Sequence, residues 1–140
     1  MRKTREAGIF VYRGDRFLVT RRRDGIWNVP AGQIEDGESF ADGAARELME
    51  EVRLAAPLID LERRKTYEVE PRDRALYAPG ERSVTLAAFA AEAPDGWEPT
   101  LNHEHIAYRW CTFDEALALL HWPEAKTGLR ALAERIGSVR

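Results

Sequence analysis

The sequence predicts an α/β (α+β) fold in which a mixed β-sheet lies between helical layers. Short apolar runs typical of strands are interleaved with two or three stretches of helical periodicity. The 140 residues are 44% hydrophobic and 32% charged, which suits one globular domain, and no internal repeat or low-complexity linker divides them. We therefore expect a single domain over residues 1–140.

The expected strands begin with an antiparallel hairpin. Residues 7–12 and 17–21 are apolar runs, separated by the short turn 13–16. A short extended piece at 27–30 leads into a glycine-bounded loop. Further strands are expected at 58–69, 83–91 and 106–112, with a polar loop at 72–81 between the first two of these.

The first helix is expected over residues 39–52, with Ser39 as its N-cap and Asp42 three residues later. Near the end of the chain, Asp114 is expected to cap a helix that runs through His121, and another helix follows from about Pro123 to Ile136. On a period of 3.6 residues, the apolar stripe of the first helix comprises Ala41, Ala44, Ala45, Leu48 and Val52.

A separate arc of this helix carries Glu47, Glu50 and Glu51. Like charges at these spacings repel by about 0.2–0.5 kcal/mol per pair in solvent. The arc is therefore either a solvated face or the binding site of a cation. Clustered carboxylate oxygens suit Mg²⁺ or Mn²⁺, but the spacing alone does not choose between the two interpretations.

The residues around this arc resemble the signature of the Nudix hydrolases. Gly32 is followed, at the spacing of that signature, by Glu38, Arg46-Glu47-Leu48, Glu50-Glu51 and the apolar Leu54. The chain departs from the pattern at Arg53, where glycine is usual, so the helix exit must avoid or tolerate a left-handed backbone angle. The resemblance implies an α/β/α sandwich with a mixed sheet and a loop–helix catalytic motif.

The resemblance also implies a metal site. Glu47, Glu50 and Glu51, with the backbone carbonyl of Gly32, would hold one or more Mg²⁺ ions, with Mn²⁺ as the alternative. Such ions neutralise a pyrophosphate and activate a water for in-line attack on phosphorus.

Three other residues receive roles from the same resemblance. Arg46 would hold a glutamate of the cluster in place, although an ordinary ion pair with Glu50 explains it equally well. Glu38 would brace the loop against the helix. The general base is expected to be Glu50 or Glu51 of the helix, with Glu104 of a later loop as the other candidate.

Several residues are candidates for binding the substrate. Arg21 and Arg23 are expected on one face of a strand that leads towards Trp27, where they would meet phosphates or only protect a solvated edge. Tyr77, in a loop with Pro79-Gly80, would stack on a flat ring or pack as an ordinary loop aromatic.

Together with the segment from Glu104 to Trp110, these features resemble the dihydroneopterin triphosphate pyrophosphatase group, which also takes dATP-like nucleotides. That likeness implies cleavage of a nucleoside or pterin triphosphate to a monophosphate and pyrophosphate. A second likeness is to the asymmetric diadenosine tetraphosphate hydrolases, whose motif usually opens with Pro-Lys-Gly where this chain has Pro30-Ala31-Gly32. A noncatalytic nucleotide-binding Nudix module ranks third, because such modules usually lack the glutamates present here.

Charge and cysteine content limit the partners and the cellular location that we expect for this protein. A net charge of −3 and a pI of about 5.7 give no basic footprint for duplex nucleic acid or an acidic membrane. The apolar run 7–12 is too short for a signal peptide or a membrane span. The single Cys111 is expected as a buried thiol. His103 and His105 are not expected to bind a soft metal, because they lie two residues apart on a loop and no cysteine accompanies them. We expect a cytoplasmic monomer or homodimer that binds a small polyphosphate, and neither nucleic acid nor membrane.

Overall fold

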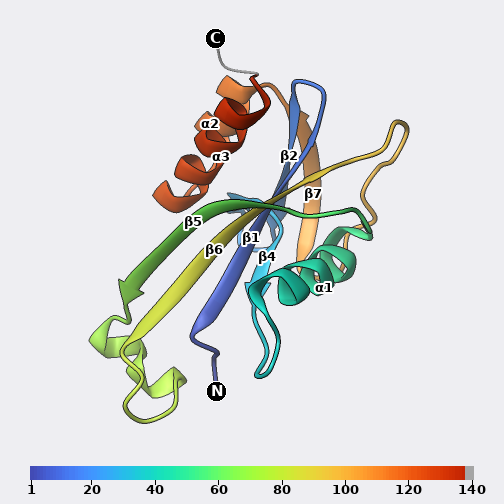
Figure 1. Cartoon of the computed structure of the whole chain (residues 1–140). Coiled ribbons are helices and arrows are strands. Elements are labelled where there is room, and N and C mark those ends of the chain that lie inside the picture. Colours follow the sequence, from blue (N-terminus) through green and yellow to red (C-terminus); the bar gives the residue numbers. More distant parts are fainter. Residues whose placement is uncertain (138–140) are drawn as a thin grey trace.

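A mixed sheet of seven strands forms the centre of the computed structural model, which describes residues 1–137 (Figure 1). The strands are β1 (Arg5–Arg13), β2 (Arg16–Arg22), β3 (Trp27–Asn28), β4 (Ala31–Gln33), β5 (Ile59–Glu68), β6 (Ser83–Glu92) and β7 (His105–Cys111). The helices are α1 (Phe40–Val52), α2 (Phe113–Leu119) and α3 (Pro123–Ile136). The 3₁₀ helix η1 (Pro71–Leu76) begins one residue before the expected polar loop 72–81 and ends within it.

The strand order is β3-β2-β1-β6-β5, with β4 also paired to β1 and β7 to β2. The β1–β6 pair is parallel and the other pairs are antiparallel, which confirms both the mixed sheet and the predicted first hairpin. No helix among residues 1–137 is long and apolar enough to span a membrane.

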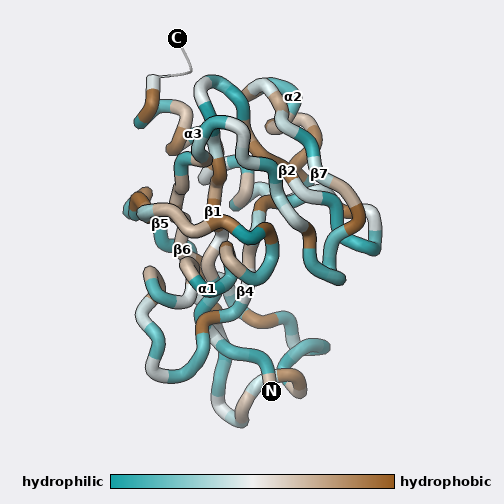
Figure 2. The backbone as a smooth tube through the Cα atoms, turned by 90° about the vertical axis from the view of Figure 1, so that its right-hand side faces the viewer, coloured by the Kyte–Doolittle hydropathy of each residue, from teal (hydrophilic) through white to brown (hydrophobic). Residues whose placement is uncertain are grey.

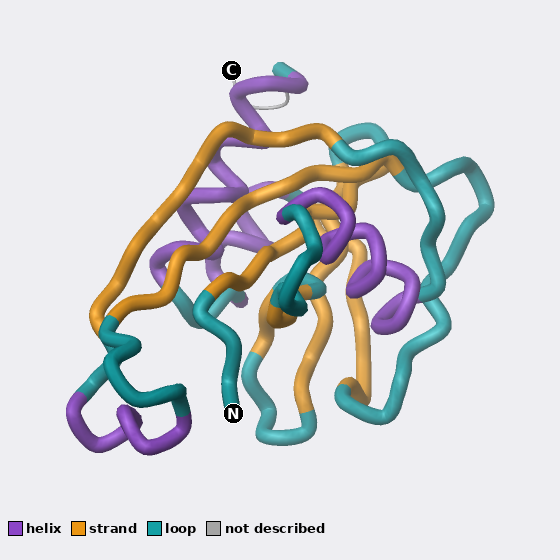
Figure 3. The backbone as a smooth tube through the Cα atoms, turned by 60° about the horizontal axis from the view of Figure 1, so that its bottom comes forward, coloured by secondary structure: helices purple, strands orange, loops and turns teal. Residues whose placement is uncertain are grey.

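The central strand β1 serves two cores because its side chains alternate between the two faces of the sheet. Ile9 and Val11 pack in the cluster that contains α1, whereas Phe10 and Tyr12 pack with α2 and α3. Figure 2 shows hydrophobic stretches of β1 at the centre of the molecule, and Figure 3 shows α1 and α3 on opposite sides of the sheet. The predicted α/β/α sandwich is confirmed.

The ends of α1 follow the sequence closely. The Ser39 hydroxyl accepts a hydrogen bond from the Asp42 backbone N–H at 3.0 Å, so the predicted N-cap is confirmed. At the other end, Arg53 adopts the left-handed conformation with φ 62° and ψ 40°, and its N–H donates to Met49. The helix therefore exits through the angle that glycine usually supplies, in spite of the arginine.

The predicted apolar stripe of α1 is wrong at Ala41 and Ala45, which are exposed. Gly43 and Glu51 are buried in their place, beside Ala44, Leu48 and Val52. A side chain at Gly43 would overlap Ile34, so the helix approaches the loop closely at this glycine. The face of α1 that is buried against the sheet and loop therefore includes Glu51.

Two other local predictions need correction. Thr112, not Asp114, caps α2: its hydroxyl accepts from Glu115 N–H at 3.2 Å, and the Glu115 carboxylate accepts from Thr112 N–H at 2.8 Å. The helix ends at Leu119 rather than at His121. This capping box outcompetes a lone aspartate because it satisfies two backbone donors at once.

The basic run at the end of β2 does not alternate as expected. The pairing with β7 shifts register between Arg21 and Arg22, and the strand ends at Arg22. The prediction that Arg21 and Arg23 share one strand face is therefore wrong, because an irregularity of this kind breaks the two-residue period.

Candidate active site

Arg46 lies at the centre of a hydrogen-bonded cluster between the loop and α1. Its guanidinium binds Glu38 with two bonds, of 2.8 and 3.0 Å, and donates to the Gln33 carbonyl at 2.9 Å. It also donates to Glu47 at 3.0 Å and to Glu50 at 3.2 Å. One arginine thus holds the loop and two carboxylates of the helix in a fixed arrangement.

The Glu38 carboxylate binds the backbone of its own loop as well as Arg46. Its carboxylate accepts the Glu35 backbone N–H at 2.7 Å. The Arg46 hydrogen bonds, and then this backbone bond, lower the pKa of Glu38 to about 2. Glu38 therefore stays ionised and braces the turn that leads into α1.

Gly32 of β4 lies directly against Glu47. A Cβ atom built on Gly32 would overlap the Glu47 carboxylate. Only a residue without a side chain lets the strand come this close, so the position needs glycine for reasons of space.

Glu51 is the most unusual group of the site, because its carboxylate is 2% exposed. Oε1 accepts the Ala31 backbone N–H at 3.3 Å, whereas Oε2 is buried and has no hydrogen-bond partner among residues 1–137. Burial and the nearby Glu47 carboxylate raise the pKa of Glu51 to about 9, and burial also raises the pKa of Glu47. A buried Glu51 beside a half-buried Glu47 calls for a proton or a cation.

The start of β7 brings two further groups to this acid. The Asn102 side-chain oxygen accepts the Glu104 N–H at 3.1 Å and lies 3.2 Å from Nδ1 of His105. Since an oxygen can only accept, Nδ1 carries the proton and the neutral ring presents the Nε2 lone pair to Glu51. Burial lowers the pKa of His105, which favours this neutral form.

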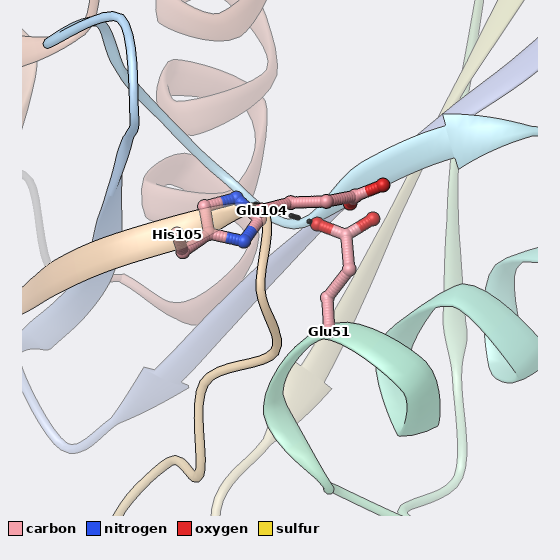
Figure 4. A group of neighbouring side chains, drawn as sticks. All are labelled: Glu51, Glu104 and His105. Carbon is pink, nitrogen blue, oxygen red and sulfur yellow. Dashed lines mark ion pairs between the residues drawn. The ribbon is translucent and has the colours of Figure 1, made fainter.

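Figure 4 shows Glu51, Glu104 and His105 pointing towards one another, Glu51 from α1, Glu104 from the turn before β7 and His105 from the first residue of β7. Each of the three offers a ligand atom within 4.8 Å of the others. A divalent cation fits here: it would satisfy the orphaned Glu51 oxygen and neutralise the buried acids. Gly32, Glu47 and Glu51 would hold it, with Glu104 and His105 within reach. His105 was not expected as a ligand from the sequence.

Glu50 lies apart from the buried pair. Its side chain is 55% exposed and its contact is with Arg46, so it takes the outer edge of the cluster. The structure therefore brings Arg46, Glu47 and Glu51 together with Gly32, and leaves Glu50 at the rim.

A cleft of about 1790 Å³ opens from these acids across the sheet towards α3. Arg23 lines it and donates to the His103 carbonyl. Arg21 lies outside the lining, where it donates to the Gly25 carbonyl at 3.4 Å. Trp27 is also outside, partly buried against the core under α3.

Tyr77 borders the far end of the cleft but is only 7% exposed, since it packs with Val69 and Val84. Its hydroxyl accepts a hydrogen bond from Arg2 at 3.3 Å. The assignment of Tyr77 as a residue that stacks on substrate stays a prediction.

The cleft also contains residues that the sequence analysis did not select, namely Asn28, Arg63, Lys65 and Trp122. The basic run Arg63-Arg64-Lys65 in an expected strand was a usable signal, because residues 63 and 65 of a strand point to the same face. Trp122, which is partly exposed at the start of α3, gave none. Cys111 is fully buried, as predicted, and lies outside the cleft lining.

The NUDIX domain profile matches residues 2–132, so the chain belongs to the Nudix family. It is a hydrolase that acts on phosphorus-containing acid anhydrides. The site described above is the place where the signature residues of that family meet.

Individual relatives support this membership. The dihydroneopterin triphosphate diphosphatase of Escherichia coli K12 is 32% identical over 120 residues, covering 79% of each chain. A solved structure of the E. coli dihydroneopterin triphosphate pyrophosphohydrolase superimposes with a TM-score of 0.82 at 27% identity, covering 96% of this chain and 97% of that one. The asymmetrical bis(5'-nucleosyl)-tetraphosphatase of Rattus norvegicus is 35% identical over 118 residues, covering 81% of this chain and 76% of that protein.

One similar protein is much longer than the region it shares. A Myxococcus xanthus protein named octanoyltransferase is 36% identical over 123 residues, which are 86% of this chain but 32% of that protein. The chain thus spans about a third of that relative.

Proposed function

We propose that the protein is a Mg²⁺-dependent pyrophosphohydrolase that cleaves a nucleoside or pterin triphosphate to the monophosphate and pyrophosphate. The observation that carries the proposal is the buried Glu51 carboxylate, with one oxygen unpartnered, at one end of a large cleft. Relatives named for dihydroneopterin triphosphate support the choice of substrate class.

Mg²⁺ suits the carboxylate and carbonyl oxygens better than a softer metal does, and Mn²⁺ is the alternative if His105 also binds. When bound, the ion supplies charge neutralisation at the phosphates and an acidified water. Arg46 keeps Glu47 and Glu50 oriented through its bonds of 3.0 and 3.2 Å.

Glu104 is our choice for the general base. Its exposed side chain lines the cleft and lies within 4.8 Å of Glu51, where it can take a proton from a water at the metal site. Glu50, by contrast, is engaged by Arg46, and Glu51 is committed to the metal site. Both helix residues remain the competing assignment.

The ring of the substrate would lie towards α3. Trp122 lines the cleft with part of its ring exposed, and the Arg22 guanidinium lies 5.2 Å from the ring centroid. A flat base or pterin can stack on such a ring, and Arg23 adds positive charge to the lining of the same cleft.

A second candidate function is asymmetric hydrolysis of diadenosine tetraphosphate. The relative named for that reaction and the large volume of the cleft both favour it. Ala31, where that group usually has lysine, counts against it.

The deciding experiment compares dihydroneopterin triphosphate, the nucleoside and deoxynucleoside triphosphates and diadenosine tetraphosphate at equal concentration with Mg²⁺, and identifies the products. Monophosphate plus pyrophosphate from the pterin or dATP is the expected result. ATP plus AMP from the dinucleotide would promote the second candidate.

Two variants test the proposed metal ligand and the proposed general base. Glu51→Gln should lower turnover by orders of magnitude with the fold intact, and near-normal activity would refute the metal assignment. Glu104→Gln should lower kcat and alter its pH profile, and an unchanged rate and profile would return the base to the helix. Glu134→Gln, an exposed position on α3, is the matched control.

A further inference from the structure

We propose that Arg63 and Lys65 of β5 form a second anion subsite, which binds the phosphoryl group of the substrate farthest from the metal site. The subsite would make the enzyme select triphosphates and longer chains over diphosphates. This inference rests on the proposed function, because it assumes a polyphosphate substrate in the same cleft.

The sheet register places Arg63 in line with the metal site. Arg63 pairs with Ala88, Ala88 with Gly8, and Gly8 with Ala31. Paired residues point to the same face, so these four form one row across β5, β6, β1 and β4. Three strand spacings make the row about 14 Å long between the outer Cα atoms.

The two ends of the row differ from its middle. At one end, Ala31 adjoins Gly32 and donates its N–H to Glu51, so the row starts at the acids. Between the ends lie Gly8 and Ala88, which line the cleft with no more than a methyl group each. Such a floor leaves room for a phosphate chain to lie across the sheet towards Arg63.

A bulge in β5 directs the two cations to this face. The pairing with β6 shifts register between Asp60 and Arg63, and Glu62 within the shift has φ 58°. Arg63 and Lys65, two residues apart in the strand, then share the side of the sheet that faces α3.

Neither cation has a carboxylate within ion-pair distance in the described part of the chain, although both line the cleft. Glu6, in the row of Lys65, is already engaged, since it accepts from Tyr67 at 3.0 Å and from Arg2 at 3.3 Å. Two neighbouring cations without a counter-charge favour an anion between them.

Arg64 provides a matched control on the same strand. It points to the opposite face, where its guanidinium lies 5.0 Å from the centroid of Phe40 and 5.6 Å from that of Phe89, and it pairs with Asp60 at 3.0 Å. Arg64 also borders the cleft, but its guanidinium is held by Asp60, so Arg64→Gln removes the same charge from β5 at a residue that is already paired.

The test compares the double variant Arg63→Gln/Lys65→Gln with wild type on one nucleoside as its triphosphate and its diphosphate, with Mg²⁺. KM for the triphosphate should rise at least about tenfold with kcat little changed, and KM for the diphosphate should change less than about twofold. The triphosphate preference should be unchanged in Arg64→Gln. An unaltered preference in the double variant overturns the subsite.

Calorimetric titration with inorganic tripolyphosphate and with pyrophosphate, in the presence of Mg²⁺, separates this inference from the proposed function. If wild type hydrolyses no triphosphate but its tripolyphosphate affinity falls in the double variant, the subsite stands and the proposed function fails. If that affinity is the same in wild type and the double variant, the subsite is refuted whatever the enzyme hydrolyses.

Discussion

Nε2 of His105 lies 3.6 Å from Oε1 of Glu51, and both side chains are almost fully buried, at 5% and 2% exposed. Asn102 fixes the imidazole so that a neutral His105 directs a lone pair, not a proton, at the carboxylate. Two lone pairs at this distance require a proton on one partner or a cation near both. A bound cation near both groups would meet this requirement, and it would also satisfy the unpartnered Oε2 of Glu51.

His105 should influence which metal the site prefers. Replacing it in His105→Phe keeps a ring of similar size but removes both nitrogens. Mn²⁺ affinity should fall at least about tenfold and Mg²⁺ affinity less, because imidazole suits Mn²⁺ better than Mg²⁺. Calorimetric titration with each metal ion measures the two affinities. His103→Gln, on the exposed neighbour, should change neither affinity, and an equal loss of both metals in the Phe variant would mean that the ring only supports the site.

Gly32→Ala should impair the site without unfolding the sheet. The added methyl group would overlap the Glu47 carboxylate and displace this proposed metal ligand. Hydrolysis should fall at least about a hundredfold while the thermal midpoint changes little, since a mispositioned ligand loses transition-state stabilisation. Gly8→Ala is the control on the paired strand, because its methyl group would meet Val29 at an ordinary 3.5 Å and would be no larger than the Ala88 side chain paired with it in the cleft floor. Equal activity of the two variants would contradict the role of the close approach.

Glu38 should stabilise the fold in a manner that depends on pH. Its pKa is about 2 in the folded protein, below the ordinary 4.5, chiefly because Arg46 donates to it. A lowered folded pKa contributes stability above the unfolded value and loses it as pH falls through the folded one. Glu38→Gln should therefore destabilise most at neutral pH, and the difference from wild type should shrink as pH falls from about 4.5 towards 2.

Urea unfolding of wild type and Glu38→Gln from neutral pH to about pH 3 checks this window. Glu35→Gln is the matched control, since Glu35 is exposed in the same loop and contributes backbone groups to the contacts there. A difference between wild type and Glu38→Gln that stays constant across pH would show that the carboxylate charge is not responsible.

Arg53→Gly should stabilise the protein. Arg53 holds φ 62°, an angle that costs a residue with a Cβ roughly 1 kcal/mol relative to glycine. The Arg53 carbonyl that accepts from Trp97 is retained in the variant. The thermal midpoint should rise by a few degrees, and Arg53→Ala should leave it nearly unchanged, because alanine keeps the Cβ. A rise of the same size in both variants would locate the effect in the arginine side chain instead.

The sequence by itself determined the sandwich, the order of the elements and the loop–helix motif, because these depend on periodicity, capping and turn residues that are local. The N-cap of α1 was predicted correctly at Ser39, whereas the N-cap of α2 was predicted at the wrong residue, because Thr112 caps that helix. The capping box from Thr112 to Glu115 was present in the sequence, yet Asp114 looked like an equally good cap when taken alone.

Only the tertiary structure decided which members of the motif act together. Helical spacing places Glu47, Glu50 and Glu51 on one arc, but docking of α1 at Gly43 buries Glu51 and leaves Glu50 at the rim. The meeting of Glu51 with His105 depends on contacts between distant parts of the chain. The row that joins Arg63 to Ala31 also depends on such contacts, because pairing between strands distant in sequence creates it. Burial and register arise from contacts distant in sequence, and no local pattern can encode them.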